Sequence, residues 1–88
     1  MEIVITFART NETIHSERIL EEAGLTVQIM PLPSVIRAGC GLCLRLPQKQ
    51  VQNATALLEQ ANIPVQGLYT RMMTGRRSTY ASYRGDTQ

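Results

Sequence analysis

Hydrophobic and polar residues alternate in four short segments of this chain, which is the period of half-buried β-strands. In residues 2–7, one face carries Ile3, Ile5 and Phe7, and the residues are types that favour strands. The same alternation predicts the other three strands over residues 25–30, 41–46 and 63–69. Pro64 lacks a backbone donor and indicates that the last of these, 63–69, is an edge strand.

Two further segments repeat their apolar residues at helical spacing. The first covers residues 12–23, with Thr10 or Asn11 as its expected N-cap. The second covers residues 48–61. The residues predicted to end the two helices in a left-handed conformation are Gly24 and Asn62.

The predicted order is strand, helix, strand, strand, helix, strand, which is the split β-α-β pattern. It predicts an α+β ferredoxin-like sandwich, with a four-stranded antiparallel sheet and two helices on one face. The end of the first helix, residues 19–25, resembles the end of the second, residues 57–63, which supports two related halves.

A chain of 88 residues allows one domain, which we place at residues 1–73. Residues 74–88 are rich in glycine, serine, threonine and arginine and lack apolar periodicity, so we expect a basic, mobile C-terminal tail. Such a tail could contact nucleic acid, but its usual role is solvation, and the tyrosines are too scattered for a stacking platform. We therefore expect no nucleic-acid partner.

Nothing in the sequence predicts a membrane segment or a leader. No run of apolar residues is long enough to cross a bilayer, and no basic segment precedes the first apolar run. The expected location is the cytoplasm, where thiols stay reduced. Two cysteines and one distant histidine make neither a disulfide scaffold nor a zinc site, so we expect no metal and no cofactor.

The candidate chemistry lies at Cys40, which stands between Gly39 and Gly41 just before the third predicted strand. Flanking glycines leave a side chain uncrowded, whereas a structural cysteine prefers an apolar niche. The pattern therefore indicates a presented, reactive thiol. The competing interpretation is a small residue in a tight turn.

The predicted fold brings Cys40 to the start of the first helix. If the third strand pairs antiparallel with the first, Cys40 lies beside Arg9, Thr10 and Asn11. The unpaired amides of a helix N-terminus and nearby guanidinium groups favour a thiolate and can hold a small anion. Arg9 and Arg37 are the candidate cations.

Cys43 is a possible resolving thiol, and the competing interpretation is a residue that merely fills the strand. Extended residues three apart are separated by roughly 10 Å, beyond the reach of a disulfide. A Cys40–Cys43 disulfide therefore requires the Gly39–Gly41 corner to turn back. With the strand's leucines facing the helices, Cys43 and Arg45 are expected on the open face of the sheet.

Gly39-Cys40-Gly41-Leu42, followed by Leu44-Arg45 and preceded by Pro31-Leu32-Pro33-Ser34, resembles a small bacterial family described as selenium/sulfur carrier proteins. The resemblance covers about residues 2–70. It implies that Cys40 is the carrier thiol, that Gly39 and Gly41 give access to it, and that Arg45 is the accompanying basic residue. Cys43 departs from the family pattern, in which we expect a small residue such as alanine or serine.

The sequence thus predicts a cytoplasmic carrier or accessory protein, without independent turnover, that holds sulfur or selenium on Cys40. The implied partners are a chalcogen donor such as a cysteine desulfurase and an acceptor such as a selenophosphate-making enzyme. One alternative is a non-catalytic small-ligand or protein-interaction domain, and another is a dithiol redox protein that uses Cys40 and Cys43. A homodimer through the open sheet face or an edge strand is a further expectation.

Overall fold

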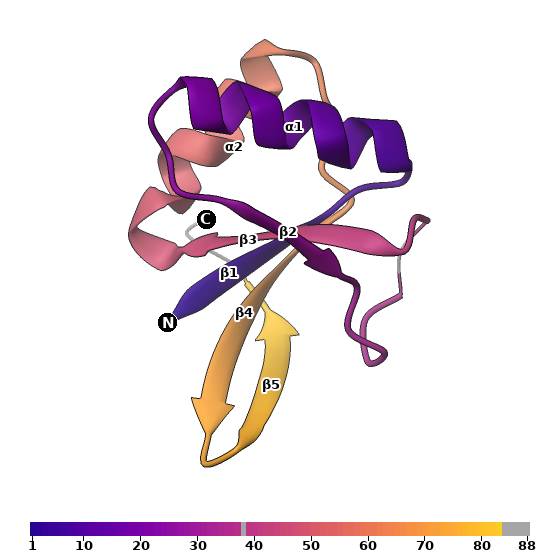
Figure 1. The fold of residues 1–88 in the computed structure, drawn as a ribbon, viewed down its shortest axis with the longest axis vertical. Coiled ribbons are helices and arrows are strands. Elements are labelled where there is room, and N and C mark those ends of the chain that lie inside the picture. Colours follow the sequence, from indigo (N-terminus) through magenta and orange to yellow (C-terminus); the bar gives the residue numbers. More distant parts are fainter. Residues whose placement is uncertain (38, 84–88) are drawn as a thin grey trace.

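The computed structural model describes residues 1–37 and 39–83. It has α+β architecture, with two helices over a five-stranded antiparallel sheet of order β2-β3-β1-β4-β5 (Figure 1). Its elements are β1 (Glu2–Thr6), α1 (Thr10–Glu22), β2 (Gln28–Pro31), β3 (Leu42–Pro47), the short 3-10 helix η1 (Gln48–Gln50), α2 (Val51–Gln60), β4 (Gly67–Thr74) and β5 (Arg77–Ser82).

The predicted pairing of the first and third strands is confirmed, because β1 and β3 run antiparallel with Thr6 opposite Cys43. The predicted count of four strands is wrong. Residues 77–82, which the sequence analysis assigned to the tail, form β5 and pair with β4 through a two-residue turn. Gly75 opens that turn with φ 62°, a conformation that glycine adopts without steric cost. Residues 84–88 of the predicted tail lie outside the described residues.

Several element boundaries differ from the prediction. The last predicted strand, 63–69, begins only at Gly67, after Pro64, which cannot donate to a ladder, and it continues to Thr74 because this part pairs with β5. The second predicted strand begins only at Gln28, the first residue that lies opposite β3. The helix predicted from residue 12 begins at Thr10.

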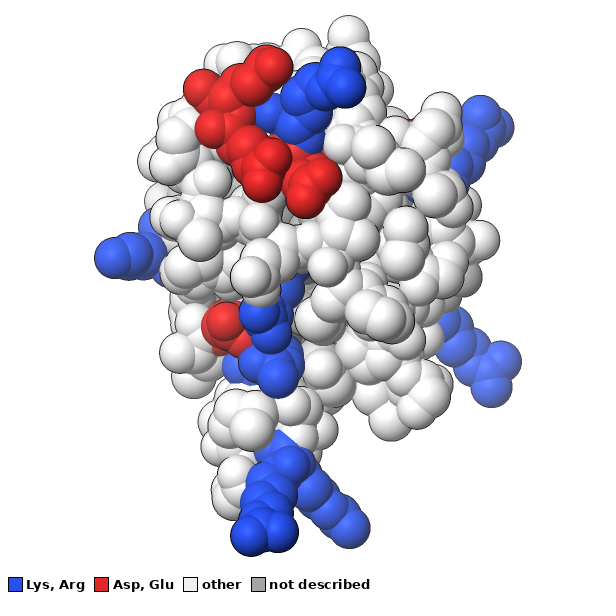
Figure 2. All heavy atoms as spheres, in the orientation of Figure 1, with Lys and Arg blue, Asp and Glu red and all other residues white. Residues whose placement is uncertain are grey.

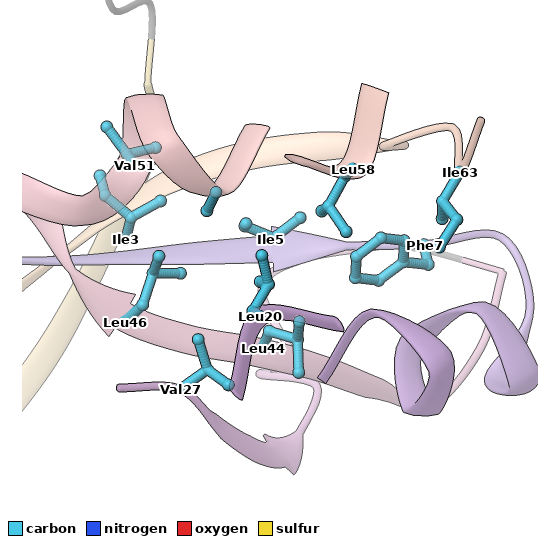
Figure 3. Packing of buried hydrophobic residues seen from close by; sticks show 11 residues of the cluster. Ile3, Ile5, Phe7, Leu20, Val27, Leu44, Leu46, Val51, Leu58 and Ile63 are labelled. Carbon is cyan, nitrogen blue, oxygen red and sulfur yellow. The ribbon is translucent and has the colours of Figure 1, made fainter. Parts of the chain in front are cut away.

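The main hydrophobic core lies between the sheet and the two helices (Figure 3). The alternation in β1 directs Ile3 and Ile5 toward the helices, where they meet Leu20 of α1 and Leu58 of α2. We call this side of the sheet the helix face. As predicted, the helices are followed by residues of positive φ, which are Gly24 at 89° and Asn62 at 59°.

A second, smaller core lies on the opposite side of the sheet, which we call the far face. Val4 and Cys43 are buried there under Ile36, and Tyr69 and Tyr80 pack against them. The predicted turn at residues 34–36 is present, with Ile36 N–H bonded to the Pro33 carbonyl at 3.0 Å, and it carries Ile36 onto the far face. The far face is therefore covered over Cys43, which corrects the expectation that this cysteine lies in the open.

The charges are unevenly distributed over the molecule. Figure 2 shows acidic side chains gathered over α1 and basic side chains at the tip of the β4–β5 hairpin. On the far face, Glu2 pairs with both Arg45 and Arg71. Partly exposed pairs of this kind contribute about 0–1 kcal/mol each, so they orient side chains more than they stabilise the fold.

No helix among residues 1–37 and 39–83 combines the length and the apolar character needed to cross a bilayer.

Candidate functional site

The segment that carries Cys40 packs directly against the junction between β1 and α1. A Cβ atom added to Gly39 would lie 2.3 Å from the Ala8 carbonyl oxygen, so only glycine allows this approach. The Gly39 N–H donates to Oε1 of Gln66 at 3.0 Å, and the Gly41 carbonyl accepts from Leu32 N–H at 2.9 Å. The backbone on both sides of the cysteine is thus held by hydrogen bonds.

The Cys40 sulfur lies on the helix face, against the first turn of α1. Its Sγ atom is 3.4 Å from Oγ1 of Thr13 and donates to the Leu42 carbonyl at 3.2 Å. Only 8 % of Cys40 is exposed, so the expectation of a fully presented thiol is wrong. The reason is tertiary, since the close approach of Gly39 to Ala8 draws the next residue under α1.

The surroundings of Gly41 differ from those of Gly39. A Cβ atom added there would meet no protein atom within 4 Å, and Gly41 is exposed. The two flanking glycines therefore have different roles. Gly39 permits close packing, whereas Gly41 lies at the exposed surface next to the cysteine.

The first turn of α1 lacks a side-chain cap. Arg9 is the N-cap residue, with an extended backbone and no hydrogen bond from its side chain, so the prediction that Thr10 or Asn11 caps the helix is wrong. The helix begins earlier because the Arg9 carbonyl already accepts the Thr13 N–H at 3.3 Å. The first backbone N–H groups of a helix have no partner within it and carry positive potential. Thr13, which contacts the Cys40 sulfur, belongs to this same turn.

Among the described residues, none of the three arginines predicted to accompany Cys40 donates a hydrogen bond to its sulfur. Arg9 and Arg37 are exposed. Arg45 lies on the far face, where it donates to Oε1 of Gln28 and pairs with Glu2 at 3.6 Å. The structure therefore brings Thr10 and Asn11 to the helix end beside Cys40 and separates Arg45 from it.

The two cysteines lie on opposite faces of the sheet. Cys40 contacts Thr13 of α1, whereas Cys43 is fully buried in the far-face core. The pKa of Cys43 is raised to about 11, mainly by burial and in smaller part by the charge of Cys40, while Arg45 acts to lower it. Cys43 is therefore a protonated thiol at neutral pH, and both cysteines are free.

Two residues of this site, Thr13 and Gln66, were missed by the sequence analysis. Thr13 and Ser16 are the two buried polar residues of α1, and a buried polar side chain is a usable signal for a specific contact. Gln66 carries no such signal, because it reaches Gly39 from a segment 27 residues away. Within residues 1–37 and 39–83, no three His, Cys, Asp or Glu residues are grouped so as to hold a metal ion.

Comparison with known proteins gives one curated relative and one family. The Escherichia coli K12 protein named "Uncharacterized protein YtiA" is 33% identical over 54 residues, which are 58% of this chain and 64% of that protein. The chain thus spans less than two thirds of the length of this relative. No solved structure matches this chain. The family model described as "Putative Se/S carrier protein-like" matches residues 2–70, which contain β1, α1, Cys40 and α2, and this chain belongs to that family.

Proposed function

We propose that this protein carries sulfur or selenium on Cys40, as a persulfide or a selenosulfide, and transfers it to an acceptor enzyme. The observation that carries the proposal is the contact of the Cys40 sulfur with Thr13, in the uncapped first turn of α1. In this proposal, the positive potential of the helix N-terminus and the Thr13 hydroxyl, which also donates to the Arg9 carbonyl at 3.4 Å, interact with the transferred sulfur or selenium. The family description supports the same cargo.

The fold that positions this site is, in our proposal, a ferredoxin-like sandwich extended by one strand. The order β2-β3-β1-β4 contains the four strands of that pattern, and β5 adds to its edge. This arrangement places the start of β3 at the start of α1, which is what brings Cys40 to the helix end.

The loading step exchanges one sulfur–sulfur bond for another. The Cys40 thiolate attacks the terminal sulfur of a donor cysteine persulfide, a new bond forms to Cys40, and the donor cysteine leaves as a thiolate. The proton lost from Cys40 balances the one that the donor thiolate gains, so no oxidant is required. For selenium, the attacked atom is the terminal selenium of the donor. The donor is a protein such as a cysteine desulfurase, and the acceptor an enzyme such as one that makes selenophosphate.

The carrier has no turnover of its own in this proposal, since its partners supply and consume the cargo. A cytoplasmic location suits it, because that compartment keeps free thiols reduced. Cys43 is a bystander, because it is buried on the other face of the sheet and stays protonated at neutral pH. This placement argues against the dithiol redox alternative, in which the two sulfur atoms must meet.

The test is transfer from a persulfide-loaded cysteine desulfurase, read by intact-protein mass spectrometry. We expect wild type and Cys43→Ser to gain the mass of one sulfur atom, and Cys40→Ser to gain none. The Cys43→Ser variant is the matched control, because it removes a thiol without touching the Thr13 contact. Equal loading of Cys40→Ser would refute the carrier role and leave the ligand- or protein-binding alternative.

A further inference from the structure

The outer edge of β5 has backbone groups without partners. The sheet order ends at β5, and no strand among residues 1–37 and 39–83 pairs with its outer side. The β4–β5 hairpin projects from the body of the molecule, away from the two helices (Figure 1). An edge of this kind is a template for pairing with another strand.

The ladder shows which residues of β5 face outward. Tyr83 N–H donates to the Leu68 carbonyl at 2.9 Å, one step beyond the Tyr69–Ser82 pair. Hydrogen-bonded and non-bonded pairs alternate along an antiparallel ladder. The outward N–H and C=O groups of β5 therefore belong to Ser78, Tyr80 and Ser82, while the inward ones belong to Arg77, Thr79 and Ala81.

Natural sheets protect such edges with prolines, charges, short strands or covering elements. The opposite edge of this sheet has this protection, because β2 is only four residues long and ends at Pro31. β5 is six residues long, contains no proline, and has its one charged residue, Arg77, beside the turn. Of the two edges, β5 is the one left available for pairing.

We propose that β5 pairs antiparallel with β5 of a second copy of this chain, which joins two five-stranded sheets into one. With Tyr80 on the two-fold axis, Ser78 of each copy lies opposite Ser82 of the other. All three outward residues then form hydrogen-bonded pairs, and each such pair exchanges two backbone bonds. In this register Arg77 lies opposite Tyr83, so the two like charges stay apart.

The side chains of β5 favour a second copy over a foreign peptide. A peptide that adds to a sheet edge gains specificity from pockets for its alternate side chains. Here the neighbouring positions on β5 are the small residues Ser78, Thr79, Ala81 and Ser82, which make no such pockets. A small, self-complementary strand fits an isologous two-fold contact.

One strand pair buries a small area, so the dimer is expected to depend on concentration. Light scattering after size exclusion should show the mass rising from 9.8 kDa toward twice that value as the chain concentration increases. Ser78→Pro removes an outward N–H without touching the ladder to β4, and should stay monomeric. Ser78→Ala is the matched control and should dimerise like wild type, and far-UV circular dichroism confirms that both variants are folded.

The register is tested separately by cross-linking in a Cys40→Ser background. Tyr80→Cys lies opposite itself in the proposed dimer, within reach of a disulfide, and should form a covalent dimer on mild oxidation. Thr79→Cys lies opposite Ala81 and should not. Monomeric wild type at every concentration, dimerisation of folded Ser78→Pro, or equal cross-linking of the two cysteine variants would overturn the proposal.

Discussion

The two glycines that flank Cys40 look equivalent in the sequence but have different structural roles. Gly39 lies against the backbone of Ala8, where a Cβ atom would be 2.3 Å from the carbonyl oxygen. Gly41 faces open space. The first glycine allows the close packing that buries Cys40 beside Thr13, whereas the second lies at the exposed surface.

This difference predicts opposite results for two identical substitutions. Gly39→Ala must move the backbone away from Ala8, and we expect a loss of about 1–3 kcal/mol in the free energy of unfolding. Gly41→Ala should change it by less than about 1 kcal/mol. Urea denaturation of the two variants checks the pair, and equal stabilities would contradict the close contact with Ala8.

At the scale of elements, the turn between β2 and β3 has the role of a cover. It carries Ile36 onto the far face, where this side chain is 5 % exposed and closes over Cys43. Burial is the largest cause of the raised pKa of Cys43. The turn, and not the strand alone, therefore keeps the second thiol unreactive.

Truncating Ile36, the side chain that covers Cys43, should expose the Cys43 thiol. In a Cys40→Ser background, we expect Ile36→Ala to increase the alkylation rate of Cys43 several-fold at pH 8, because less burial lowers its pKa and opens a path to it. Alkylation is followed by mass spectrometry. Leu58→Ala is the control, since it weakens the helix-face core without uncovering Cys43. If both variants speed alkylation equally, the reaction follows global unfolding and the cover has no specific role.

At the scale of the whole molecule, the sheet separates a large core under the helices from a small one on the far face. Domains of this size are stable by only about 5–15 kcal/mol, and most of the buried apolar side chains here lie on the helix face. The helix-face core therefore holds α1 over the sheet, and with it the helix end that contacts Cys40.

Leu58→Ala should cost about 2–5 kcal/mol in the free energy of unfolding, because Leu58 is fully buried between α2 and the sheet. Ile14→Ala, on the exposed side of α1, should cost no more than about 0.5 kcal/mol. Urea denaturation measures both losses. A small effect of Leu58→Ala would mean that this core contributes less than its burial indicates.

The alternation of residues along β1 and β3 was sufficient to predict both strands, and the split β-α-β order of the elements predicted their antiparallel pairing and the placement of Cys40 beside the first helix. It succeeded because side-chain alternation and chain order are local properties. The missed strand β5 also had a local signal, since Gly75 lies at the start of a two-residue turn between residues that favour strands. The glycine, serine and threonine content of that segment and its lack of apolar periodicity suggested a tail and outweighed this signal.

By itself, the sequence determined the α+β class, both helices and the position of the Gly-flanked cysteine at the mouth of β3, because hydrophobic period and chain order are written into neighbouring residues. Only the tertiary structure decided that Cys40 is mostly buried, that Thr13 and Gln66 hold its surroundings, and that Cys43 and Arg45 lie on the other face. These properties depend on contacts between residues far apart in the chain, whose distances and directions are set by packing.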